Sequence, residues 1–154
     1  MTVKVLVECL KGTKEKYEKS TNGDTLILDR LLKRKWVANY GCILNTLQAD
    51  GDELDCYIIG VKLDRGQVID AMPICIIYVI DNMVVDNKII CAAPTAGKYN
   101  INKLVKKIFR FIHKYKKNSF PVSASYKSAN IQYELAKCQA YYNLFRGGKS
   151  GCQH

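Results

Sequence analysis

The stretch Asp50-Gly-Asp-Glu-Leu-Asp-Cys-Tyr-Ile-Ile-Gly-Val61 organises the chain, because an acidic turn runs in it directly into an apolar strand. Its first six residues hold four of the 14 acidic side chains, in a protein with 24 Lys and Arg. Carboxylates crowded in this way repel one another unless a positive charge lies among them. The stretch therefore predicts an oxygen-rich cation site, of the kind that suits Mg²⁺. The alternative is a plain hairpin turn at Asp50-Gly51 with exposed acids. Glu53 has no assigned role in either interpretation, and we expect it to face solvent.

Apolar and β-branched segments predict strands through the first two thirds of the chain. We expect them at residues 3–7, 25–30, 54–61, 68–80 and 88–93. Asn22-Gly23 is a strong hairpin signal before the second of these strands. Pro73 cannot donate a ladder hydrogen bond, so it should bend the 68–80 strand or place it at an edge. Short strands at this spacing are typical of a closed or nearly closed antiparallel barrel.

The last third of the chain changes to a helical period. One predicted helix has an apolar face formed by Ile101, Leu104, Val105, Ile108, Phe109 and Ile112. A second should run from about Ser128, as its N-cap, to Phe145. Its apolar stripe would be Ala129, Tyr133, Ala136, Ala140 and Leu144. We therefore expect an α+β fold in which two C-terminal helices pack against the barrel, with a flexible tail at residues 147–154.

Length, charge and cysteine usage limit the class of protein. A chain of 154 residues is one domain, here residues 1–146, and its net charge of +10 implies an anionic partner or a solvated Lys-rich surface. Seven scattered cysteines without a CxxC pair indicate reduced thiols rather than a disulfide framework or a zinc site. The N-terminus has no signal-peptide core, and no apolar run approaches the roughly 20 residues of a membrane span. We expect a soluble, cytoplasmic protein.

Two further groups of side chains are candidates for chemistry. Asp81 and Asp86 link two apolar strands; alone they form a connecting loop, but beside the first acidic cluster they would complete a site for more than one metal ion. The cationic candidates read singly as solvated surface, although Arg30 ends a strand and offers a forked contact to phosphate. These candidates are Lys16, Arg30, Lys88 and Tyr115-Lys116.

Six blocks of residues occur in an order that resembles the soluble family I inorganic pyrophosphatases, and the acidic stretch resembles their D-x-D-x-x-D signature. The resemblance covers most of residues 3–116. It implies a five-stranded OB-like barrel and Mg²⁺-dependent hydrolysis of pyrophosphate to two orthophosphates. The blocks are Glu8-x7-Lys16-Tyr17-Glu18, Leu28-Asp29-Arg30, Asn39-Tyr40-Gly41, Asp50-Gly-Asp-Glu-Leu-Asp55, Asp81-x4-Asp86-x-Lys88 and Tyr115-Lys116.

The same resemblance implies a role for each matching residue. Asp52 would be the general base that helps deprotonate a water between two metal ions, and Glu8 and Glu18 would tune the site. The metal ligands would be Asp50, Asp55, Asp81 and Asp86. The phosphate-binding side chains would be Lys16, Arg30, Tyr40, Lys88, Tyr115 and Lys116. The family also implies a homo-oligomer, either a hexamer or a dimer.

The chain departs from the family pattern in several places, among them Cys9-Leu10, which replaces a common Ile-Pro. Trp36-Val37 stands where the family usually has Tyr-Pro, and Asn82 stands where a second acid often follows the position of Asp81. These changes leave open a degenerate pyrophosphatase retained as a scaffold. A second alternative is an OB-like module for single-stranded nucleic acid. Its tyrosines would be Tyr115, Tyr126, Tyr133, Tyr141 and Tyr142, which could equally pack the helices on the barrel.

Overall fold

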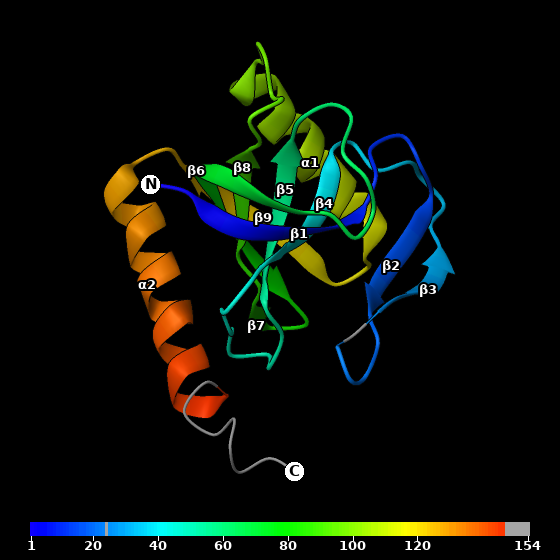
Figure 1. Cartoon of the computed structure of the whole chain (residues 1–154). Helices are drawn as coiled ribbons and strands as arrows, with labels where there is room; N and C mark the ends of the chain where they lie inside the picture. The colour runs from blue at the N-terminus through cyan, green and yellow to red at the C-terminus, as the bar shows by residue number, and fades with distance from the viewer. Residues whose placement is uncertain (24, 147–154) are drawn as a thin grey trace.

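The computed structural model describes residues 1–23 and 25–146 (Figure 1). The predicted flexible tail, including Gly147-Gly148, lies outside the described residues. The elements in chain order are β1 (Val3–Cys9), β2 (Glu15–Lys19), β3 (Leu26–Leu31), β4 (Asn39–Ile43), β5 (Leu54–Ile59), β6 (Val68–Asp81), β7 (Val84–Val85), β8 (Lys88–Ala92), α1 (Ile101–Tyr115), β9 (Ser119–Ser125) and α2 (Ser128–Phe145).

Five strands pair in a closed ring, which confirms the predicted OB-like α+β architecture. The order is β1–β4–β5–β8–β6, and β6 pairs back onto β1. One pairing differs from the antiparallel expectation, because β5 and β8 are parallel. Between β5 and β8 the chain forms the long strand β6, which is antiparallel to β8. After this crossover, β8 runs in the same direction as β5. The register of β6 against β8 shifts between Pro73 and Cys75, where the proline lacks an amide donor.

Four strands were not expected from the sequence: β2, β4, β7 and β9. β2 pairs only with β3, and this two-stranded sheet projects to the right of the barrel in Figure 1. Its sequence, Glu-Lys-Tyr-Glu-Lys, lacks an apolar face because the strand lies outside the barrel core. The hairpin expected at Asn22-Gly23 does join these two strands. β9 contains Pro121 and pairs along β6 at the edge of the sheet.

The first helix agrees with the sequence more closely than the second. α1 begins after Asn100, whose side chain accepts a hydrogen bond from the Lys103 amide, and its predicted face is buried or half-buried. In α2 the N-cap is Lys127, so Ser128 was wrongly expected to cap it. The buried residues of α2 include Ile131, Leu135 and Cys138. The five residues of the predicted stripe are all exposed: Ala129, Tyr133, Ala136, Ala140 and Leu144. Apolar residues follow both sides of α2, so periodicity alone cannot choose between them.

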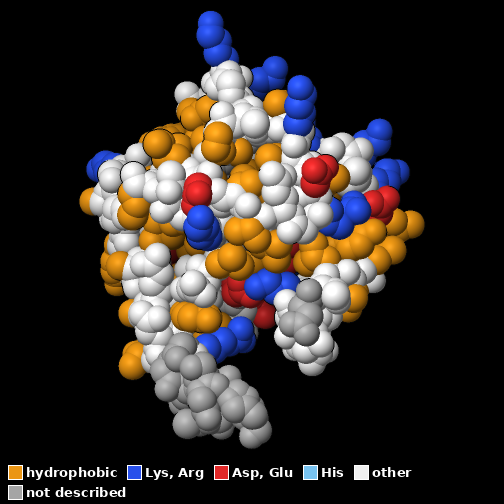
Figure 2. All heavy atoms as spheres, viewed as in Figure 1, with side chains coloured by type: hydrophobic (Ala, Val, Ile, Leu, Met, Phe, Trp, Pro, Cys, Tyr) orange, Lys and Arg blue, Asp and Glu red, His pale blue; other side chains and the backbone are white. Residues whose placement is uncertain are grey.

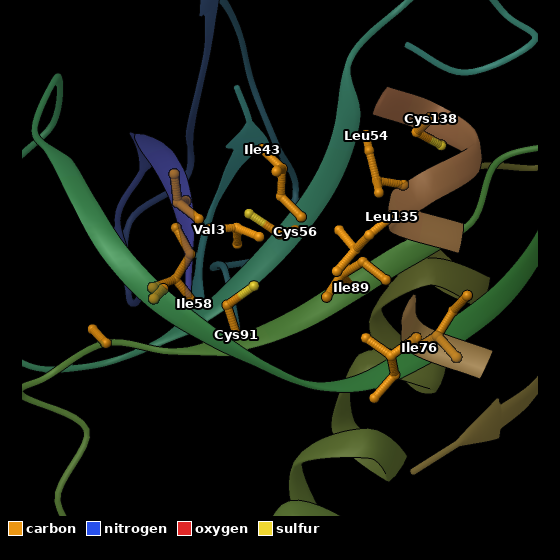
Figure 3. Packing of buried hydrophobic residues seen from close by; sticks show 14 of the residues in the cluster. Val3, Ile43, Leu54, Cys56, Ile58, Ile76, Ile89, Cys91, Leu135 and Cys138 are labelled. Atoms are coloured by element: carbon orange, nitrogen blue, oxygen red, sulfur yellow. The ribbon is translucent and has the colours of Figure 1, made fainter. Parts of the chain in front are cut away.

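One apolar cluster is built from residues of all five barrel strands and of α2, and a second is built from barrel residues and α1. In the first, Leu135 and Cys138 of α2 pack with Leu54 and Ile76 of the barrel (Figure 3). Phe111 of α1 belongs to the second cluster. All six cysteines of the described chain are buried free thiols, as expected for hydrophobic packing. In the part of the chain that is described, neither helix is long and apolar enough to cross a membrane.

Candidate active site

Acidic and cationic side chains from distant parts of the chain line one cavity of about 460 Å³. Figure 2 shows carboxylates beside a cationic group in the lower centre of one face, next to the tip of the β2–β3 hairpin. The cavity contains every site residue predicted from the sequence except Arg30. These are Glu8, Lys16, Glu18, Tyr40, Asp50, Asp52, Asp55, Asp81, Asp86, Lys88, Tyr115 and Lys116.

The acidic turn between β4 and β5 is closed by its own backbone. The Gln48 amide donates to the Asp52 carbonyl at 2.8 Å, and the Asp50 carboxylate accepts from the Asp52 amide at 2.9 Å. Gly51 has a φ of +89°, which glycine adopts without strain. The turn expected in the plain hairpin interpretation is therefore present, and it directs its carboxylates into the shared cavity.

The second acidic pair, Asp81 and Asp86, comes from a later part of the chain, around β6 and β7, and lines the same cavity. Asp81 ends β6, and Asp86 follows β7, with its amide bonded to the Val79 carbonyl at 2.9 Å. The turn between them contains Asn82 and Met83, both at positive φ. Asn82 is exposed and does not line the cavity. The position at which the family often has a second acid is therefore outside the set of side chains that line the cavity.

Lys88 joins the two acidic groups. It is 6% exposed, and its ammonium donates to Asp55 at 3.1 Å, to Asp86 at 3.2 Å and to the Tyr40 hydroxyl at 3.0 Å. Burial by itself lowers the pKa of Lys88, but the two carboxylates outweigh it, so the pKa is raised and the side chain stays charged. Lys116 pairs in the same way with Asp81 at 3.1 Å.

Burial raises the pKa of two carboxyl groups in the cavity. Together with the neighbouring charges of Asp55 and Glu53, it raises the pKa of Glu8 from 4.5 to about 8. Burial also raises the pKa of Asp50, and the charge of Asp86 adds to the effect. In both groups burial is the main cause, because it disfavours the charged form of a carboxyl group.

The donor set of the cavity fits a hard divalent cation. Carboxylates with room for water are the ligands that Mg²⁺ prefers. Among the described residues, no three His, Cys, Asp or Glu side chains lie close enough to share one ion. Lys88 lies between Asp55 and Asp86, and Lys116 holds Asp81, so ammonium groups satisfy these carboxylates.

Arg30 lies at the edge of the cavity rather than in it. It lines an adjoining hollow with Tyr115, and its guanidinium donates to the Tyr115 hydroxyl at 3.0 Å. Trp36 is buried in the aromatic wall next to them, with its ring 4.8 Å from Tyr40 and 5.1 Å from Phe111. The indole that replaces the family's usual tyrosine is thus a packed part of the cavity wall.

Sequence reasoning missed several polar residues of the site. Glu53 was expected to face solvent, but it pairs with Lys19 at 2.6 Å and accepts from the Cys42 thiol at 3.2 Å. That expectation was wrong because Glu53 lies in a loop, where no periodicity indicates the direction of a side chain. Both Glu53 and Lys19 line the cavity.

A buried amide network connects the two acidic loops. The Gln48 side chain donates to the Asn87 carbonyl at 3.0 Å, and the Asn87 side chain donates to Glu134 of α2 at 3.2 Å. All three residues are buried. Gln48 precedes the first acidic turn and Asn87 follows Asp86, so α2 fixes both loops. No sequence signal identified this link, because its members do not belong to a motif.

Carboxylates and cationic side chains that share one cavity beside aromatic rings form a class of site that can bind metal ions and a phosphate compound together. The comparisons agree with this class. Residues 5–141 match the family model described as inorganic pyrophosphatase, and the chain belongs to that family.

Individual relatives and structures give the same result. The inorganic pyrophosphatase of Saccharolobus solfataricus is 40% identical over 91 residues, which are 57% of this chain and 53% of that protein. The one from Picrophilus torridus is 32% identical over 126 residues, 75% of this chain and 71% of that protein. The chain thus spans about half the length of the first of these relatives. An inorganic pyrophosphatase structure from Neisseria gonorrhoeae superposes with a TM-score of 0.83, at 24% identity, covering 92% of this chain and 91% of that one.

Proposed function

We propose that this protein hydrolyses inorganic pyrophosphate to two orthophosphates with Mg²⁺ as its cofactor. The observation that carries the proposal is the convergence of Asp50, Asp52 and Asp55 with Asp81 and Asp86 in one cavity, under a rim of cations. Membership of the inorganic pyrophosphatase family supports it. A nucleic-acid module would have no use for this acidic cavity, since carboxylates repel phosphates.

The metal ligands in this proposal are Asp50, Asp55, Asp81 and Asp86. When bound, Mg²⁺ supplies charge neutralisation of the phosphates and a lowered pKa for an attacking water. The all-oxygen donor set supports a cation at this place. A cation that took over Asp55 and Asp86 would release the Lys88 ammonium for contact with phosphate.

Asp52 is the proposed general base. Its side chain is exposed to the cavity and, among the described residues, makes no ion pair. Its carboxylate is therefore available to accept a proton from water, whereas Asp55 and Asp86 are bonded to Lys88. A base that accepts this proton makes the water a better nucleophile towards phosphorus.

The cationic and hydroxyl groups of the site are proposed to hold the phosphates and to stabilise the leaving group, where negative charge accumulates. Lys16 is held near the cavity by Asp29 at 3.3 Å and by Glu18 at 3.9 Å. Glu8 and Glu18 are proposed to tune the site, directly or through water. The proposed phosphate-binding groups belong to Lys16, Arg30, Tyr40, Lys88, Tyr115 and Lys116.

We also propose a cytoplasmic location and a homo-oligomeric state, a hexamer or a dimer. The buried free thiols of the described chain support a reducing compartment. Self-association is supported by the exposed apolar side of α2, where Tyr133 is 63% and Leu144 is 65% exposed.

Phosphate release from Mg²⁺-pyrophosphate tests the proposed activity. The wild type should release phosphate and EDTA should abolish the release. Asp52→Asn should lower kcat by roughly 10²- to 10⁴-fold, the usual contribution of a general base. Asp64→Asn is the matched control, because this exposed carboxylate does not line the cavity, and it should stay within about twofold of wild type.

Two results would reject the proposal. One is an absence of phosphate release by folded wild-type protein. The other is equal activity of Asp52→Asn and wild type. Salt-dependent binding of a short oligonucleotide without Mg²⁺, in place of hydrolysis, would favour the nucleic-acid alternative.

A further inference from the structure

A second hollow, of about 650 Å³, lies on the other side of the aromatic wall, between the turn after β1, the loop after β3 and the outer face of α1. Eight of its ten lining residues are Lys or Arg, and none is acidic. The eight are Lys11, Lys14, Lys33, Arg34, Lys35, Lys107, Arg110 and Lys114. We call this set the basic hollow.

The charges of the basic hollow are not balanced within the protein. All eight side chains are exposed, and among the described residues none of them forms an ion pair with a carboxylate. In contrast, eight of the 14 acidic residues of the chain line the candidate catalytic cavity. A concave surface lined by one sign of charge concentrates its potential and attracts a multivalent counter-ion. The basic hollow is therefore suited to a polyanion.

The basic hollow and the candidate catalytic cavity both share lining residues with a smaller hollow of about 250 Å³, which Arg30 also lines. The smaller hollow shares Phe111 and Tyr115 with the catalytic cavity, and it shares Lys33 and Lys114 with the basic hollow. Cationic side chains thus follow one path from the rim of the cavity to the outer surface of α1. This arrangement suits an extended anion, with charge along its whole length.

The side chains on this path indicate which polyanion it fits. Proteins that bind single-stranded nucleic acid stack bases on exposed aromatic rings. Phe111 is only 4% exposed, and the Tyr115 ring is stacked on it at 5.5 Å and faces the Arg30 guanidinium at 5.4 Å. The path therefore offers charge and hydrogen-bond donors but no free ring for a base. A chain of phosphates without bases meets this requirement.

We propose that the basic hollow binds linear inorganic polyphosphate, with the chain running along Lys33 and Lys114 towards Arg30. That the polyphosphate chain approaches the catalytic cavity rests on the function proposed above, whereas the binding of this chain in the basic hollow does not. A chain that reaches Arg30 and Tyr115 occupies the entrance used by pyrophosphate, so it competes with that substrate.

The test compares two triple variants of the full chain. Lys35→Ala/Lys107→Ala/Arg110→Ala removes three cations that line only the basic hollow. Lys98→Ala/Lys103→Ala/Lys127→Ala removes three exposed cations that line none of the three hollows. The probe is linear polyphosphate of about 15 phosphates in EDTA, titrated into each protein by calorimetry. Pyrophosphate hydrolysis and thermal unfolding, measured on the same preparations, check that each variant is folded.

The hollow variant should bind polyphosphate roughly tenfold more weakly than wild type, since three exposed charge contacts are lost, and the control should change by less than about threefold. Both variants should keep the kcat/KM for pyrophosphate within about twofold, and polyphosphate should raise the wild-type KM. An equal loss in both variants would overturn the proposal, as would the absence of polyphosphate binding by wild type.

A single-stranded RNA of the same phosphate number separates the two polyanions. RNA that binds as tightly as polyphosphate and depends on the same three residues would make this a nucleic-acid surface and overturn the proposal. If polyphosphate binds as expected while pyrophosphate is not hydrolysed, the proposed function fails and the polyphosphate site stands. If hydrolysis occurs and polyphosphate does not bind, only the polyphosphate site fails.

Discussion

Lys88 supplies the counter-charge that the crowded carboxylates require. It lies opposite Asp55 in the parallel pairing of β5 and β8, and its ammonium bonds both Asp55 and Asp86. Removing one partner of a buried ion pair leaves the other charge uncompensated. The lysine and any bound cation therefore act on the same carboxylates, which ties the stability of the fold to the occupancy of the site.

Glu8 gives the metal-free protein a pH-dependent stability. Because burial raises its pKa from 4.5 to about 8, the folded state binds this proton more tightly than the unfolded state. Its contribution is complete below pH 4.5 and is lost as the pH rises through about 8. When the pH is raised from 5 to 8 in EDTA, the unfolding free energy of Glu8→Gln should therefore fall less than that of wild type. The difference between the two falls should be roughly 2 to 4 kcal/mol.

Urea denaturation at several pH values measures this difference. Glu18→Gln is the control, because it removes a half-exposed carboxylate from the same cavity. Its stability profile should run parallel to that of wild type. Parallel profiles for Glu8→Gln and wild type would show that burial does not hold the proton on Glu8.

At the scale of elements, α2 positions the acidic loops. The Leu47 amide donates to the Cys138 carbonyl at 3.0 Å, and the Arg146 guanidinium donates to the Gly51 carbonyl at 2.8 Å. Glu134 completes the link through Asn87. The helix thus fixes loops that lie between β4 and β5 and between β7 and β8, although it contributes no residue to the cavity itself.

Asn87→Ala should weaken both the fold and the site. The change removes the acceptor for the Val79 amide and the donor to Glu134, both buried. Each unsatisfied buried group costs about 1 to 3 kcal/mol, so the unfolding free energy should fall by roughly 2 to 6 kcal/mol. The Mg²⁺ affinity should fall about tenfold, as for other residues that orient metal ligands.

Urea denaturation and Mg²⁺ titration of folded protein check the two effects separately. Asn102→Ala is the matched control, since this exposed side chain bonds only the Tyr126 hydroxyl among the described residues. It should change neither quantity measurably. An Asn87→Ala protein with normal Mg²⁺ affinity would mean that α2 does not position the acidic loops.

The buried face of a helix could be predicted from the sequence where the helix has a single apolar pattern. α1 has a single apolar stripe, and its face agrees with the structure, whereas α2 has two, and the exposed one was selected. The motif residues could be named from the resemblance because their blocks keep the family's order along the chain, although they lie on barrel strands, on the separate β2–β3 sheet, in loops and at the end of α1. Gln48, Asn87 and Glu134 could not be found, because their contacts exist only after the loops and α2 meet.

At the scale of the whole molecule, acids gather in the candidate catalytic cavity and cations gather in the basic hollow, while α2 is one of several elements that carry exposed apolar residues. In Figure 1, α2 lies along the left side of the barrel, away from the β2–β3 hairpin. Self-association through α2 would therefore leave the entrance of the cavity open.

Replacing the exposed apolar residues of α2 should reduce self-association. Tyr133→Lys/Leu144→Lys places two charges on this face, and burying them in an interface is unfavourable. Sedimentation velocity should show an oligomer for wild type and a smaller species for this variant. Val61→Lys/Met72→Lys, at exposed apolar positions outside α2, should sediment like wild type. A monomeric wild type, or an unchanged Tyr133→Lys/Leu144→Lys variant, would contradict the proposed interface.

The central claim is that the two acidic loops jointly hold divalent metal ions. A crystal structure of the protein with Mn²⁺, which substitutes for Mg²⁺ and scatters anomalously, tests it most directly. We predict anomalous peaks in the cavity, coordinated by oxygens of Asp50 and Asp55 from one loop and of Asp81 and Asp86 from the other. A cavity that stays without Mn²⁺ at millimolar concentration, with Lys88 still bonded to Asp55 and Asp86, would contradict the claim.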